Sequence, residues 1–129
     1  MNGSPQSPFD EAIGTEWLSD DPAEARVRLA VRDEHKQPTG LVHGGVYSTL
    51  IESVCSRATA LAVSGDGMVA MGQGLQISFI RPITDGTVQV TARARHRGRT
   101  TWVWDAEVTD AEGRTCAIAQ MTTAVRPRR

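Results

Sequence analysis

The segment from Gly40 to Val63 constrains the fold of this chain most strongly. His43-Gly44-Gly45 opens a run that predicts one long helix, from about His43 to Val63. A helix that is apolar on most of its sides belongs in the interior of a fold. The rest of the chain is therefore expected to wrap around this helix. Its apolar positions are Val46, Leu50, Ile51, Val54, Cys55, Ala58, Leu61 and Ala62.

Outside this segment, apolar and polar residues alternate, which predicts β-strands. One strand is expected before the helix, where Ala25, Val27, Leu29 and Val31 alternate with polar residues. After the helix the period of two continues to the end of the chain, with Leu75, Ile77 and Phe79 on one strand face. The four strands expected there cover residues 68–81, 88–96, 100–109 and 114–125.

Glycines mark the breaks between these elements. Ser64-Gly65-Asp66-Gly67 supplies a helix end, and Thr84-Asp85-Gly86 predicts a hairpin turn. Gly72 and Gly74 predict a bulge within the first long strand. Strand, long helix and antiparallel meander together predict an α+β fold whose sheet wraps one central helix, the outline of a hotdog fold. Because such a sheet has edges to be paired, we expect a homo-oligomer.

Length and composition restrict the classes of function. The 129 residues suit one domain, expected over residues 11–129 after a flexible lead-in over residues 1–10. Residues 11–18 are expected to form a short strand or a helical turn. A net charge of −1 gives no support for nucleic-acid or membrane binding, and no apolar run is long enough to cross a bilayer.

The cysteines and histidines indicate neither a disulfide framework nor a metal site. Cys55 and Cys116 are expected to be reduced, buried thiols of a cytoplasmic protein. Three dispersed histidines and these two cysteines lack the spacing of metal ligands. Phosphate-loop and dinucleotide motifs are absent from the sequence. We therefore expect no metal and no cofactor.

The carboxylate of Glu52 is the first candidate for chemistry. It lies in the middle of the predicted helix, with Ser56 four residues later on the same face. A carboxylate on a buried helix is costly unless it is paired or used. Glu52 could attack an acyl carbonyl or activate water, or it could form a structural ion pair with Arg57 or with an arginine from a strand. Ser56 could place a water, or bond back to the helix.

The start of the helix is the second candidate. Backbone N–H groups at a helix N-terminus can hold an oxyanion, and Gly44 has no Cβ to block its approach. Gln37, in the preceding loop, could donate its amide to the same carbonyl. In the alternative interpretation the glycines only permit a tight turn, Gln37 is a surface residue, and His43 is a structural residue of the helix start.

The spacing of these candidates predicts how they are combined. Gly44 and Glu52 are eight residues apart, about 12 Å along a helix. An oxyanion donor and a carboxylate that act on one thioester must both lie within a few ångströms of its carbon. If both are catalytic, Gly44 of one chain must meet Glu52 of another, so the chemistry itself predicts a dimer.

These residues resemble those of the hotdog-fold acyl-CoA thioesterases, most closely the Arthrobacter-type 4-hydroxybenzoyl-CoA thioesterases. The resemblance runs from about residue 24 to the end. Its motifs are Gly40 to Tyr47, then Glu52, Gly72-Gln73, Ser78 to Pro82, Thr100 to Asp105 and Ala124 to Arg129.

The resemblance implies a role for each matching residue. Glu52 matches the catalytic carboxylate, Gly44 the donor that polarises the carbonyl, Gln37 an assisting side chain, and Ser56 a threonine that helps to place water. Arg81, Thr100 and Arg129 match positions that hold the nucleotide end of CoA. Arg128 could substitute for its neighbour, and Arg99 stands where the family type has serine. His43 is included with the CoA-binding residues. The family is tetrameric, a dimer of dimers with sites built across subunits.

The expected reaction is hydrolysis of an aromatic acyl-CoA, such as a hydroxybenzoyl or phenylacetyl thioester, to the free acid and CoA. Tyr47, Met68 and Met71 are the residues expected at the acyl group. Several alternatives stay open: a thioesterase for aliphatic acyl groups, a non-catalytic acyl-CoA-binding module, and a hotdog dehydratase. Without a CoA ligand, the arginines at strand ends and at the C-terminus would form only a solvated rim.

Overall fold

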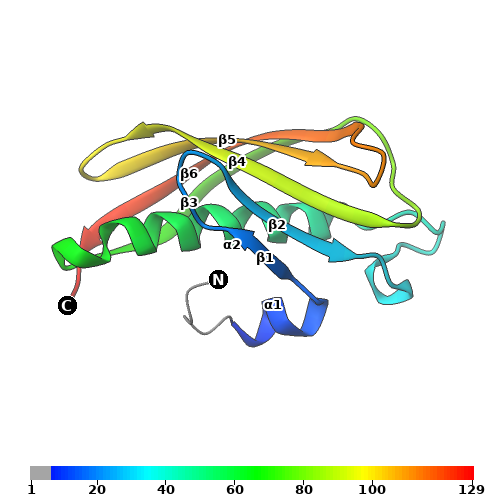
Figure 1. Ribbon diagram of the computed structural model, residues 1–129, viewed down its shortest axis with the longest axis horizontal. Helices are drawn as coiled ribbons and strands as arrows, with labels where there is room; N and C mark the ends of the chain where they lie inside the picture. Colours follow the sequence, from blue (N-terminus) through cyan, green and yellow to red (C-terminus); the bar gives the residue numbers. More distant parts are fainter. Residues whose placement is uncertain (1–6) are drawn as a thin grey trace.

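The computed structural model describes residues 7–129, which form a six-stranded sheet with a long helix, α2 (Gly44–Val63), packed on one face (Figure 1). All neighbouring strands are antiparallel, in the order β1-β2-β4-β5-β6-β3. This is the predicted hotdog arrangement. The strands are β1 (Glu16–Ser19), β2 (Ala25–Ala30), β3 (Met68–Phe79), β4 (Thr87–Arg97), β5 (Thr101–Thr109) and β6 (Thr115–Pro127).

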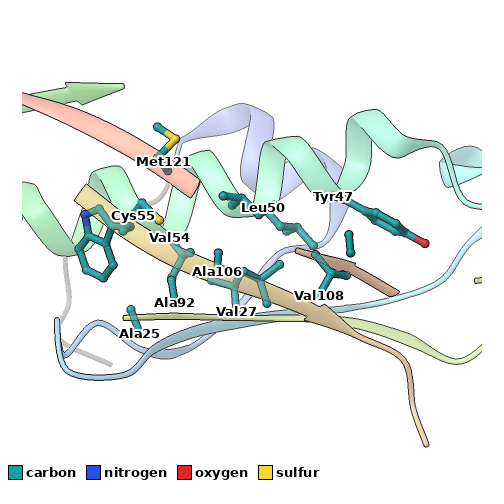
Figure 2. Close-up of a cluster of buried hydrophobic side chains, with 14 of the residues drawn as sticks. Ala25, Val27, Tyr47, Leu50, Val54, Cys55, Ala92, Ala106, Val108 and Met121 are labelled. Carbon is teal, nitrogen blue, oxygen red and sulfur yellow. The ribbon is translucent and has the colours of Figure 1, made fainter. Parts of the chain in front are cut away.

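The core lies between α2 and the concave face of the sheet. Figure 2 shows Leu50, Val54 and Cys55 of α2 pointing toward side chains of the strands, among them Val27 and Ala106. Trp102, Trp104, Ala106 and Val108 of β5 are all buried, as their alternation predicts. The packing of these side chains determines which face of α2 lies against the sheet, and hence which face of α2 points away from it.

A buried polar contact ties α2 to the sheet. The Trp104 Nε1–H donates to Thr59 Oγ1 at 3.0 Å, and the Thr59 hydroxyl donates to the Cys55 carbonyl at 2.7 Å. Thr123 Oγ1 of β6 lies 3.1 Å from the same Thr59 oxygen. Each of these buried groups therefore has a partner, as interior polar groups require.

The predicted breaks at the end of the helix and within β3 are confirmed, but the hairpin predicted at Thr84-Asp85-Gly86 is wrong. This turn joins β3 to β4, and the two strands do not pair: β3 pairs with β6 at the sheet edge, whereas β4 pairs with β2 and β5. Only β4, β5 and β6 therefore form the predicted meander. The pairing of β3 with β6 shifts register between Gly72 and Gly74. A short 3₁₀ turn (Ser64–Asp66) follows α2 and ends at Gly67, whose φ of 72° suits a residue without a Cβ.

The N-terminal segment differs from the predicted lead-in. A short helix, α1 (Pro8–Ile13), begins inside residues 1–10, and Asp10 is buried. The Ser7 side chain caps it by accepting from the Asp10 N–H at 3.1 Å. Pro8 to Asp10 therefore belong to the folded chain, while residues 1–6 lie outside the described residues.

Strand β3 forms one edge of the sheet, and much of it is exposed. Leu75 pairs with the buried Met121, so it faces the helix side of the sheet, yet it is 37% exposed. Phe79 on the same face is 57% exposed, and Met71 is 50% exposed. Helix α2 contacts β3 at Gly72 and at Phe79 but leaves these apolar side chains partly uncovered. A single chain therefore leaves an apolar strip along β3.

Candidate active site

Glu52 opens onto a pocket on the side of α2 that faces away from the core. The sequence predicts a buried carboxylate, whereas the structure leaves Glu52 exposed in the single chain, because the sheet covers only one side of the helix. Its Oε2 lies close to Gly72 of β3. The pocket has a volume of 380 Å³, and its wall is formed by Ser7, Phe9, Asp10, Trp17, Thr49, Glu52, Ser53, Ser56 and Arg57.

Ser56 lies in the same pocket, as the helical spacing predicts. Its Oγ is buried and has no hydrogen-bond partner among the described residues, so the predicted alternative of a bond back to the helix is not observed. An unpartnered buried hydroxyl carries a cost. It is consistent with a group that bonds to a water or to a bound molecule beside Glu52.

Gly44 lies in a different pocket, at the start of α2. Gln37, Gly44 and Arg81 all line this pocket of 300 Å³, together with Phe79 of β3. Gly44 is the first residue of the helix, so the helix does not use its N–H. A Cβ on Gly44 would lie 2.8 Å from the Phe79 ring. Only glycine therefore allows that ring to close over the helix start.

Two aromatic side chains support the same end of the helix. The Tyr47 and Phe79 rings are 5.9 Å apart. Burial raises the pKa of Tyr47 to about 12, so its phenol stays protonated at neutral pH. The sequence places Tyr47 at the acyl group, but in this chain Tyr47 is buried beside Gly44 and does not line the Glu52 pocket.

His43 is the residue that caps α2. Its Nδ1 accepts from the Gly45 N–H at 3.1 Å. This hydrogen bond fits the alternative interpretation of the sequence, in which His43 is a structural residue of the helix start. The ring also lines a third pocket, of 350 Å³, beside Phe9 and Thr49.

The predicted CoA-binding residues fall into two groups. The Arg81 N–H donates to the carbonyl of Cys116 at 3.0 Å, near the start of β6, whereas the Thr100 carbonyl accepts from the Val125 N–H at 2.9 Å, near its end. Cys116 and Val125 are nine positions apart on one strand, which is about 30 Å. One chain therefore does not bring Arg81 together with Thr100.

The second group forms a basic end of the molecule. The Arg128 N–H donates to the carbonyl of Gly67 at 2.9 Å, and both Arg128 and Arg129 are exposed. Arg99 lines a pocket of 570 Å³. Met68 lines this pocket too, so it is far from the acyl role that the sequence gives it, and Met71 lies on the exposed edge strand.

Sequence reasoning missed the N-terminal half of the Glu52 pocket. Phe9 and Asp10 come from α1 and Trp17 from β1, in the part of the chain expected to contribute least. The Arg57 guanidinium lies 4.8 Å from the centre of the Trp17 ring, a cation–π contact across the pocket wall. The sequence pattern Ser7-Pro8, a capping residue before proline, was the available signal for α1.

Residues 7–129 contain neither a membrane-spanning helix nor a metal-binding cluster. No helix in this range has the length and hydrophobicity to cross a membrane. The same residues hold no cluster of His, Cys, Asp or Glu side chains arranged to bind a metal ion.

Comparison with known proteins decides the family. A family model described as "Thioesterase superfamily" matches residues 39–117, which include the start of α2, Glu52 and the Gly72–Gly74 bulge. The chain belongs to the thioesterase superfamily. It is therefore a thioester hydrolase by family, on a hotdog fold.

Individual relatives support this membership. The chain is 34% identical to a 1,4-dihydroxy-2-naphthoyl-CoA hydrolase of Listeria monocytogenes, over 94% of this chain and 98% of the relative. It is 32% identical to the proofreading thioesterase EntH of Cronobacter turicensis, over 97% of this chain and 90% of the relative.

A solved structure is similar along nearly the whole chain. Thioesterase SAV0944 of Staphylococcus aureus superposes with a TM-score of 0.89 at 26% identity, covering 94% of this chain and 100% of that one. Two structures of that protein carry single substitutions to alanine, one of a glutamine and one of a glutamate fifteen positions later.

Proposed function

We propose that this thioesterase hydrolyses aromatic acyl-CoA thioesters, with Glu52 as the reacting carboxylate and 4-hydroxybenzoyl-CoA as the first candidate substrate. The observation that carries the proposal is the pairing of an exposed Glu52 carboxylate with the unpartnered hydroxyl of Ser56 in one pocket. In SAV0944 a glutamine and a glutamate fifteen positions apart were chosen for substitution. Gln37 and Glu52 have the same spacing, which supports their assignment as a functional pair.

Each group has a defined task in the reaction. The Gly44 N–H, helped by the Gln37 amide, donates to the thioester oxygen as negative charge develops there. Glu52 either attacks the carbonyl carbon, giving an anhydride that water then opens, or takes a proton from a water that attacks the same carbon. The C–S bond breaks in both routes, and CoA leaves as the thiol once its sulfur is protonated. Ser56 orients the attacking water.

The separation of the two pockets supports a site shared by two subunits. Gly44 of the partner subunit must reach Glu52, because the donor and carboxylate of one chain lie about 12 Å apart along α2. A two-fold axis parallel to the two helices would place each residue beside its own copy, so Gly44 would not meet Glu52. The axis must therefore lie perpendicular to the helices, which then run antiparallel. Ser48, halfway between Gly44 and Glu52, then lies near the axis.

The exposed β3 edge supports the same arrangement. The twelve-residue strand β3 pairs with β6 on one side only, and its free edge, with apolar residues beside the helix, is a surface that a second copy can pair with. Antiparallel pairing of β3 with its copy also needs a two-fold axis perpendicular to the strand, as the antiparallel packing of the helices does. We further propose that two such dimers form a tetramer in which Arg81 and the group Arg99, Thr100, Arg128 and Arg129 come from different subunits to hold CoA. His43 caps its helix beside this site.

Two features support an aromatic acyl group. Phe9 and Trp17 contribute two aromatic rings to the wall of the Glu52 pocket, and an aromatic acyl group can pack against them. The Listeria relative is named for a naphthoyl-CoA thioester, which is also aromatic. We expect the reaction to need no cofactor, because CoA enters as part of the substrate, and we expect the enzyme to act in the cytoplasm.

A thiol-release assay tests the function. The panel is 4-hydroxybenzoyl-, benzoyl-, phenylacetyl-, hexanoyl- and palmitoyl-CoA, with Glu52→Ala and Glu52→Gln alongside the wild type. We expect fast release from an aromatic thioester and loss of turnover in both variants with CoA binding retained. Release from aliphatic members only would overturn the aromatic assignment. Binding without any hydrolysis by the wild type would overturn the catalytic role.

A further inference from the structure

Helix α1 is held in place at both of its ends, against α2 at its start and by Arg32 at its end. Near its start, the Ser53 hydroxyl of α2 donates to Asp10 Oδ1 at 2.7 Å, and the Ser7 hydroxyl donates to Asp10 Oδ2 at 2.8 Å. Near its end, an Arg32 guanidinium N–H donates to the carbonyl of Ala12 at 2.7 Å. Because polar contacts hold both ends, α1 has a defined position beside α2. Its contact residue on α2, Ser53, directly follows Glu52 in the sequence.

This position places Phe9 between two pockets. Its side chain is 61% exposed, and it lines both the pocket of 380 Å³ that holds Glu52 and the pocket of 350 Å³ that holds His43. Thr49 of α2 is the other residue common to both. The two pockets are therefore neighbours along α2, with the Phe9 ring and Thr49 at their boundary.

Of these two side chains, Phe9 is the one whose removal would join the pockets. The threonine side chain is short, and its hydroxyl donates to the Gly45 carbonyl at 2.9 Å. The phenylalanine ring is larger and is carried by α1, which Asp10 holds in place. An acyl group that enters beside Glu52 therefore meets the ring before it can extend toward His43.

We propose that Phe9 is a specificity-determining residue that limits the length of the acyl group. With Phe9 present, the Glu52 pocket takes an acyl group of about the size of one or two aromatic rings. Without the ring, the pocket continues along α2 toward Val46 and His43 and accepts a long straight chain. The inference rests on the proposed function, since it takes the Glu52 pocket to be the acyl pocket.

The test compares the wild type, Phe9→Ala and a control, Ile118→Ala, which truncates an apolar residue that is 50% exposed on β6 away from both pockets. The substrates are benzoyl-, hexanoyl-, decanoyl- and palmitoyl-CoA. We expect Phe9→Ala to raise kcat/KM for decanoyl-CoA relative to benzoyl-CoA by at least tenfold. The control should keep the wild-type ratio. Thermal unfolding checks that α1 stays folded.

A second readout separates this inference from the proposed function. Binding of decanoyl-CoA and benzoyl-CoA is measured by calorimetry in the Glu52→Ala background, with and without Phe9→Ala, so that no turnover is needed. A selective gain in decanoyl-CoA affinity supports the role of Phe9 even if the wild type hydrolyses nothing. Equal changes for all acyl groups, or no change in either readout while the wild type hydrolyses thioesters, would overturn it.

Discussion

The Oε2 atom of Glu52 lies 2.8 Å from the position that a Cβ atom would occupy on Gly72 of β3. The carboxylate of the helix thus packs directly over a strand residue that has no side chain. Gly72 is also at the bulge of β3, where the strand changes register against β6. The bulge and the missing Cβ together leave room for the carboxylate at the edge of the sheet.

Gly72→Ala should therefore impair catalysis more than folding. The added methyl would displace the Glu52 carboxylate and the end of Met121, whose Cε lies 2.9 Å from the same position. Overpacking of this kind costs about 1–3 kcal/mol. We expect kcat/KM to fall more than tenfold in a thiol-release assay. Gly74→Ala, next to Thr122 rather than Glu52, is the control, and equal losses in the two variants would argue against a role for this contact.

The proposed two-fold axis near Ser48 predicts a cross-link. In a Ser48→Cys variant, a short bis-maleimide should join two chains in high yield, because equivalent residues near an axis lie close together. Ser64→Cys, which is exposed beyond the far end of α2, should give little product. Cross-linking that is equal at both positions, or stronger at the second, would rule out the antiparallel arrangement.

The native cysteines should not interfere with that experiment. Burial raises the pKa of the Cys55 thiol, and burial is also the main reason that the pKa of Cys116 is raised. Since the thiolate is the reactive form, neither thiol should react with a thiol reagent at pH 8 in the folded protein. Both should react in denaturant, and rapid labelling of the native protein would contradict their burial.

Thr59→Val tests the contact between helix and sheet. The substitution keeps the shape of the side chain but removes the oxygen that accepts from Trp104 Nε1. A buried donor left unpaired costs about 1–3 kcal/mol. Chemical denaturation should show this loss, whereas Thr91→Val on the outer face of β4 should be close to neutral. Unchanged stability in Thr59→Val would mean that the indole finds another partner.

Most of the fold could be predicted from the sequence because its signals are local. Three signals each extend over only a few residues. They are the apolar residues on most sides of the helix over residues 46–62, the alternation along each strand, and the glycines at the breaks. Helix α1 has only six residues, too few to show a helical period. The sequence therefore predicts only a short strand or a helical turn from residue 11, without deciding between the two. The cap of α1 at Ser7-Pro8 is a weaker signal than periodicity.

The site was harder to predict because it depends on what covers α2. The sequence proposes Glu52, Ser56, Gly44 and Gln37 as candidates, but an apolar helix gives no sign of which side the sheet covers. The carboxylate was thus expected to be buried, and it is exposed in one chain. The walls supplied by Phe9 and Trp17 arise from contacts between segments far apart in the sequence.

The most direct test of the central claim mixes two damaged subunits. Glu52→Ala and Gln37→Ala chains, each with its own tag, are co-expressed, and the mixed oligomers are purified through both tags and assayed for thiol release. If the site combines Glu52 of one chain with Gln37 of the partner subunit, random pairing restores one intact site in half of the dimers, or about a quarter of wild-type activity before enrichment. If each chain carried a complete site, the mixture would be no more active than the average of the two variants alone.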